Sequence, residues 1–143
     1  MTPDAGDAQL RDAARSPFAL RLRRLWFVIG LALVAAVVWL SLVPLPSPPG
    51  KHTDKLEHFA TYAVLMLWFA QLRPGRRPRA VTAVALVVLG VGIEFLQDLT
   101  PYRMMDPVDM AANAIGVVLG WIAAPPRTPN VLDGVIRRVS VHS

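Results

Sequence analysis

The sequence predicts an all-α, polytopic membrane protein with four transmembrane helices. Residues of the apolar and aromatic set make up 54% of the 143 residues, charged residues make up only 17%, and the mean hydropathy is +0.43. A soluble domain carries about 25% charged residues. The length is that of one domain, so a single compact unit with short tails is expected. The chain has no cysteine, which excludes disulfide frameworks, thiolate metal sites and cysteine nucleophiles.

The expected helices cover residues 25–43, 56–72, 80–99 and 107–124. The first has no charge and is long enough, at a rise of about 1.5 Å per residue, to cross a hydrocarbon core of about 30 Å. A signal peptide is the competing interpretation, but the apolar run is long and no A-x-A-like cleavage site follows it. The other three segments are weaker. None of the 13 prolines lies inside a segment beyond its first position, and an interior proline would leave backbone groups that lipid cannot satisfy.

The distribution of positive charge predicts the orientation. Of the 15 Lys and Arg residues, 12 lie in residues 1–24, in the loop between the second and third helices, or in residues 125–143. Cytoplasmic segments carry such an excess, so both termini are expected in the cytoplasm, with residues 1–24 as a basic arm, 25–124 as the membrane domain and 125–143 as a tail. Residues 131–141 are expected to form a basic amphipathic segment at the membrane surface. Nucleic acid is not an expected partner, because no groove-reading motif accompanies the arginines.

Polar residues of three expected helices gather near their extracytoplasmic ends. The second helix and the two residues before it contribute Asp54, Lys55, His58 and Tyr62. The third helix contributes Glu94 and Gln97, and the fourth contributes Asp109 and Asn113. The loop before the fourth helix contributes Arg103 and Asp106, the expected N-cap. Ionisable groups inside a membrane are costly and often mark functional sites. Because these groups reach a common depth, we expect a pocket that opens toward the outer surface.

Each of these groups also has a structural interpretation. Arg103 would form an ion pair with Asp106 or Asp109 that closes the third loop, and Glu94 or His58 would form hydrogen bonds between helices. In the functional interpretation, His58, Glu94 and Asp109 are candidate catalytic acids or bases. One histidine among carboxylates is a weak metal signal, so no metal and no cofactor are expected, and the sequence leaves open whether a divalent ion bridges the carboxylates.

Small and aromatic residues predict how the helices pack. Ala112, Gly116 and Gly120 recur every four residues, which is typical of close helix approach in membranes. The four tryptophans lie toward the ends of expected helices, where membrane proteins place interfacial anchors.

Three motifs together resemble the VanZ-like family of small bacterial membrane proteins. They are D-K-x-x-H-x-x-x-Y from Asp54, E-x-x-Q from Glu94, and R-x-x-D-x-x-D-x-x-x-N-x-x-G from Arg103, and they cover about residues 50–124. The sequence departs from the family at Tyr102, where a glycine is more usual. The resemblance implies a multi-pass protein of the bacterial plasma (inner) membrane. The family's namesake is linked to reduced susceptibility to the glycopeptide teicoplanin, and the resemblance implies no particular reaction.

The preferred hypothesis is a pocket that binds or processes an anionic lipid or a lipid-linked cell-envelope precursor. Lys55, His58 and Arg103 would contact the headgroup, and apolar helix faces would hold the chain. The sequence leaves open whether the protein is an enzyme or a homo-oligomer. The alternative is a noncatalytic membrane adaptor, in which the polar residues are structural and the GxxxG face or basic tails recruit a partner protein. A transporter ranks third, because four short helices would need to oligomerise to form a path.

Overall fold

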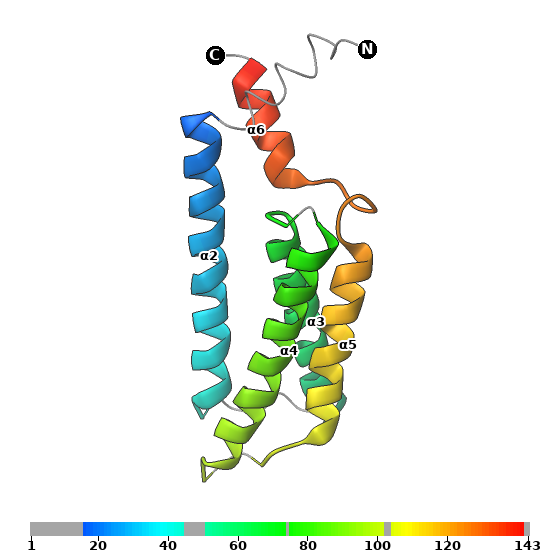
Figure 1. The fold of residues 1–143 in the computed structure, drawn as a ribbon. Helices are drawn as coiled ribbons and strands as arrows, with labels where there is room; N and C mark the ends of the chain where they lie inside the picture. The colour runs from blue at the N-terminus through cyan, green and yellow to red at the C-terminus, as the bar shows by residue number, and fades with distance from the viewer. Residues whose placement is uncertain (1–15, 45–50, 74, 102–103, 142–143) are drawn as a thin grey trace.

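The structure, a computed structural model, describes residues 16–44, 51–73, 75–101 and 104–141. These residues are all-helical, with five helices and no strand: α2 (Pro17–Leu42), α3 (Lys51–Ala70), α4 (Arg76–Asp98), α5 (Pro107–Ala123) and α6 (Val131–Val141). Helices α2 to α5 lie side by side, and the short α6 lies at the end of this group where α2 begins, at the top of Figure 1.

The first helix begins at Pro17 rather than at residue 25. Ser16 is its N-cap, with the Ser16 hydroxyl accepting a hydrogen bond from the Ala19 N–H at 3.1 Å, and Pro17 occupies the first helical position. Both residue types are preferred there, so the Ser-Pro pair sets the boundary and part of the expected basic arm is helical. Similarly, α3 begins at Lys51, ahead of the expected residue 56.

Among the described residues, two helices are long and apolar enough to cross a membrane, against the four expected. These are α2 and α4. Helix α5 is apolar but has only 17 residues. Helix α3 has 20 residues, and its first seven positions include Lys51, Asp54, Lys55 and Glu57.

The core lies where α5 crosses α3. A Cβ atom added at Gly116 would collide with the carbonyl oxygen of Phe59, and one added at Gly120 would collide with that of Ala63. The prediction of close packing by small residues is therefore confirmed. This backbone contact fixes the position of α5 along α3, and thereby the relative positions of the polar residues at one end of the two helices.

At the other end of the helices, α2 and α6 are attached to this core. The rings of Trp26 and Trp68 stack with centroids 4.0 Å apart, and each indole N–H donates to the other residue's carbonyl oxygen. These two tryptophans thus join α2 to α3, a role that the expected membrane anchoring did not include. In α6, Leu132 and Ile136 are buried against α2, whereas Val131, Val135 and Val139 on the adjacent face are exposed.

Candidate functional site

The polar residues predicted from the sequence meet where α3 and α5 begin and α4 ends, at the bottom of Figure 1. We define the polar cluster as Lys55, His58, Tyr62, Glu94, Asp106, Asp109 and Asn113. Its members come from three helices and the α4–α5 loop. These residues lie up to 58 positions apart in the sequence. The packing of α5 on α3 brings them together.

The rim of the polar cluster is an ion-pair network. The Lys55 ammonium donates to a carboxylate oxygen of Asp106 at 2.6 Å and to one of Asp109 at 2.9 Å. Asp106 also caps α5, because its other oxygen accepts from the Val108 N–H at 2.8 Å, as the sequence predicts. The hydrogen bond from Lys55 and the Val108 N–H hold the pKa of Asp106 below its ordinary value of 3.8. Lys55, which the hypothesis assigned to the ligand, already has two carboxylate partners.

The interior of the polar cluster contains the three candidate acid–base residues. His58, Glu94 and Asp109 each offer one ligand atom, and these atoms lie within 4.8 Å of one another. The Nδ1 of His58 lies 3.1 Å from Oδ1 of Asn113, and since an amide oxygen can only accept, Nδ1 is the donor. One oxygen of Glu94 accepts from the Asp106 N–H at 3.1 Å. The α4 carboxylate is thereby bonded to the backbone at the start of α5.

Three buried polar atoms of the polar cluster have no hydrogen-bond partner among the described residues. They are the Tyr62 hydroxyl, Oε1 of Glu94 and Nδ2 of Asn113, in residues that are only 1–2% exposed. A Cβ atom on Gly90 would lie 3.1 Å from the Tyr62 hydroxyl and 3.0 Å from this nitrogen, closer than an ordinary contact, so the glycine lets both groups approach the backbone of α4. Sequence reasoning missed Gly90, although it stands one helical turn before Glu94. A buried polar atom without a partner costs about 1–3 kcal/mol, so these atoms are candidates for contacts with water or a ligand.

Of the remaining predicted site residues, the structure describes the side chain of Gln97 alone, and it does not join the polar cluster. Gln97 is buried and donates to the Ser41 carbonyl at 2.9 Å, so it ties α4 to the end of α2. Tyr102 and Arg103 lie outside the described residues, and so does the side chain of Asp54.

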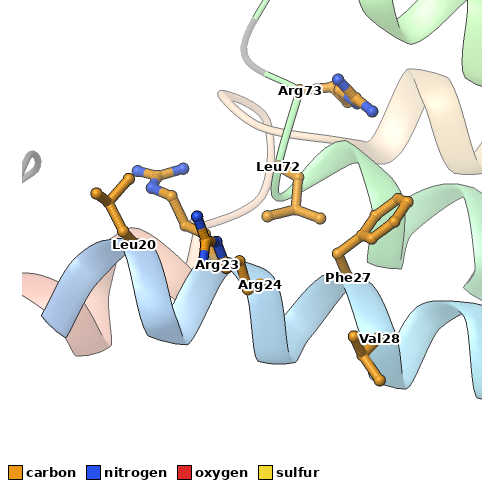
Figure 2. Close-up of a pocket in the computed structure, with 7 residues that line it drawn as sticks. All are labelled: Leu20, Arg23, Arg24, Phe27, Val28, Leu72 and Arg73. Carbon is orange, nitrogen blue, oxygen red and sulfur yellow. The ribbon is translucent and has the colours of Figure 1, made fainter. Parts of the chain in front are cut away.

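A second concave region lies at the opposite end of the helices, where no site was predicted. Figure 2 shows this basic groove, whose volume is about 480 Å³. Its lining residues are Leu20, Arg23, Arg24, Phe27, Val28, Leu72 and Arg73. Arg23 forms an ion pair with Asp133 of α6, so the groove lies beside the attachment of that helix.

Buried polar side chains near the basic groove bond to the backbone. Arg79 donates to the carbonyl oxygens of Arg73 and Pro125, and the Gln71 side chain accepts from the Val131 N–H at 2.9 Å. The sequence indicated Arg79 only as one of the loop charges. Its burial was not predictable, because nothing in the local pattern separates it from the exposed Arg76 and Arg77.

Comparisons with known proteins agree with these motifs. The family model described as VanZ/LLP1 matches residues 29–128, which is more than half of the chain. An uncharacterized protein of the fission yeast Schizosaccharomyces pombe is 31% identical over 108 residues, which cover 73% of this chain and 64% of that relative. The chain therefore spans less than two thirds of that relative's length. No solved structure gives a significant match. From the family match and the three motifs, we conclude that the chain belongs to the VanZ/LLP1 family.

Proposed function

We propose that this chain is a multi-pass membrane protein that binds the anionic headgroup of a lipid or lipid-linked cell-envelope molecule at the polar cluster. In this proposal α2 to α5 all cross the membrane, both termini are cytoplasmic, and the polar cluster lies in the outer leaflet. Binding is the core of the proposal. Any chemistry would fall to His58, Glu94 and Asp109 as acids or bases.

The outer surface of the helices supports a location in the membrane. Leu25, Val28 and Leu31 of α2 are each about half exposed, and the same is true of Val84 and Val88 of α4. Only 6% of the apolar window of α2 is buried inside the protein. A soluble monomer rarely exposes so much contiguous apolar surface, because water orders around it unfavourably, whereas lipid tails cover it without that cost.

Helix α3 fits this arrangement despite its charges. Its charged residues all lie in its first two turns, and the segment after them is apolar and largely buried among the other helices. Residues Leu65, Met66 and Ala70 of this segment belong to the core. A central helix of this kind needs little hydrophobicity of its own to cross a membrane, because its neighbours shield it from lipid.

The three buried atoms without partners are the observation that carries the proposal. The Tyr62 hydroxyl and Nδ2 of Asn113 are donors, and Oε1 of Glu94 is an acceptor when ionised. A headgroup that carries both phosphate and hydroxyl groups offers the complementary atoms. Lys55, whose side chain is 33% exposed, is the cation at the rim, and a headgroup that binds it would share it with Asp106 and Asp109. An effect on glycopeptide susceptibility would follow if the ligand is a lipid-linked envelope precursor.

Native mass spectrometry of the purified full-length chain tests this proposal. We expect the wild type to retain a lipid that Glu94→Gln loses, because the variant replaces the unpartnered carboxylate oxygen. Glu57→Gln is the matched control: it makes the same change at an exposed position of α3 outside the polar cluster, and it should retain the lipid. Identical spectra without lipid for all three proteins would overturn the proposal.

Cysteine labelling tests the proposed topology, because the chain has no native cysteine. Single cysteines at Ser47 and Thr100 should react with an impermeant maleimide added to intact cells, whereas one at Gly75 should react only after lysis. The reverse pattern would place the polar cluster on the cytoplasmic side.

The adaptor alternative loses one of its two surfaces. Gly116 and Gly120 face α3 inside the protein, so the GxxxG face is not available to a partner. The remaining candidate surface is the basic end of the helices, which the predictions below probe separately.

A further inference from the structure

The charges of the polar cluster do not balance. Among the described residues of the polar cluster, three carboxylates, those of Glu94, Asp106 and Asp109, accompany one ammonium, that of Lys55, and the imidazole of His58. Glu94 and Asp109 are only 1% and 6% exposed. Uncompensated carboxylates are expensive to bury, so a cation or protons must accompany them. An anionic headgroup alone would worsen this imbalance.

The interior residues have the composition of a metal site. A histidine nitrogen and two carboxylate oxygens lie within 4.8 Å of one another and come from α3, α4 and α5. In a tetrahedral site with ligand distances of about 2.1 Å, donor atoms stand about 3.4 Å apart. A side-chain rotation that moves each donor atom by about 1 Å would therefore bring the three donors onto one ion.

The hydrogen bonds of these residues leave suitable ligand atoms. Because Nδ1 of His58 donates to Asn113, the neutral form of the ring carries its lone pair on Nε2, and the bond fixes the ring as partners of metal-bound histidines do. Glu94 uses Oε2 for the Asp106 N–H, and its Oε1 is buried without a hydrogen-bond partner. Asp109 binds Lys55 through Oδ1 and can present its other oxygen.

The unpartnered donors point to a ligand beyond the three side chains. The Tyr62 hydroxyl and Nδ2 of Asn113 are at least 98% buried and lie on the same side of α4, around Gly90. Both would donate to an oxygen held next to the ion, such as a water or a phosphate oxygen. Three protein ligands with an open fourth position are typical of sites that bind or activate a further group.

We propose that His58, Glu94 and Asp109 bind one divalent transition-metal ion, of the Zn²⁺ or Mn²⁺ class, whose open position receives an anionic oxygen of the headgroup. A mixed nitrogen and carboxylate set favours these ions over Mg²⁺ and Ca²⁺, which prefer oxygen ligands alone. This inference rests on the proposed function and deepens it, because the ion would let an acidic end of the protein bind an acidic ligand.

Metal content is the first test. The full-length chain is purified with a tag that contains no histidine and is stripped of metal with a chelator. It is then loaded with Zn²⁺ or Mn²⁺ and desalted, and its metal content is measured by inductively coupled plasma mass spectrometry. We expect about one ion per chain in the wild type and in Glu57→Gln. Glu94→Gln and His58→Gln should lower the affinity by about 100-fold or more, and Asn113→Ala, which removes the bond to His58, by about 10- to 100-fold.

A spectroscopic measurement separates a specific site from surface binding. In the Mn²⁺-loaded protein, electron spin echo modulation should report one coupled ¹⁴N nucleus that is lost in His58→Gln. Circular dichroism and gel filtration in detergent show whether each variant is folded. Wild-type protein that takes up no ion, or Mn²⁺ without nitrogen coupling, would overturn the metal site.

The lipid measurement distinguishes this inference from the proposed function. If the stripped protein still retains lipid and binds no metal, the metal site is wrong and the proposed function stands. If one ion binds at His58 and no lipid is found with or without it, the metal site stands and the proposed function is wrong. Lipid retained by the loaded protein and released on chelation would support both.

Discussion

The two ends of the helices differ in how their buried polar groups are satisfied. Near the basic groove, Arg79 of α4 donates to the backbone carbonyls of Arg73 and Pro125, which follow α3 and α5. The side chain of Gln71 accepts from the backbone N–H of Val131 in α6. At the polar cluster, the Tyr62 hydroxyl, Oε1 of Glu94 and Nδ2 of Asn113 have no partner among the described residues. The comparison teaches that burial alone does not mark a site. Polar groups at the first end stabilise the fold, whereas those at the second leave hydrogen-bonding capacity that, in our proposal, a ligand uses.

The largest effect on stability is expected at the close contact between α5 and α3, because both ends of the helices depend on it. In Gly116→Ala the new Cβ would collide with the Phe59 carbonyl, so α5 must move away from α3, at a cost of about 1–3 kcal/mol. Gly92→Ala is the matched control, because its Cβ would have nothing within 4 Å. Thermal unfolding in detergent should show a lower midpoint for Gly116→Ala alone. Equal midpoints would show that the close packing does not hold the polar cluster together.

The basic end should respond to substitution in stability alone. Arg79→Gln removes hydrogen bonds to the carbonyls of Arg73 and Pro125, which should destabilise the protein by about 1–3 kcal/mol. Arg77→Gln makes the same change at an exposed position and should have little effect. Lipid retained by the folded fraction should be unchanged in both variants. Loss of lipid from folded Arg79→Gln would move the binding site to the basic end.

The polar end should show the opposite behaviour. Without bound ligand, Glu94→Gln removes a buried carboxylate yet can still accept from the Asp106 N–H, so we expect stability to be unchanged or raised by about 1 kcal/mol. Proteins often gain stability when a functional group of a binding site is removed. Thermal unfolding of chelator-stripped, delipidated protein measures it. Strong destabilisation would instead make Glu94 a structural residue.

The smallest effect concerns the rim. The pKa of Asp106 is lower in the folded protein than its ordinary value of 3.8, so its ionised form stabilises the fold. That stabilisation is complete above about pH 4 and is lost as the pH falls through the lower, folded pKa. The melting midpoint should fall in that acid range for the wild type and less steeply for Asp106→Asn, which keeps a good N-cap residue. Parallel curves for the two proteins would contradict this role of Asp106.

Much of the polar end was predictable from the sequence, because it follows from the spacing of polar residues along the helices and from the residue types that begin a helix. His58 and Tyr62 share a face of α3 by their spacing, and Asp106 followed by Pro107 predicted the start of α5. The sequence could not predict that Lys55 would be neutralised by two carboxylates, because that depends on how far α5 slides along α3. For the same reason Gln97, which resembled a site residue, turned out to bind α2.

The basic end was largely unpredictable. Its polar contacts join residues far apart in the sequence, such as Arg79 with Pro125 and Gln71 with Val131, and none of them belongs to a recognisable local motif. The stacking of Trp26 on Trp68 likewise depends on the tertiary contact between α2 and α3. Hydropathy described these regions only as helix ends with positive charge.

An experimental structure of the full-length chain in a lipid nanodisc tests the central claim most directly. The account predicts non-protein density larger than a water molecule within hydrogen-bonding distance of Oε1 of Glu94, the Tyr62 hydroxyl and Nδ2 of Asn113. Side chains that satisfy one another there, with no such density at the polar cluster, would contradict it.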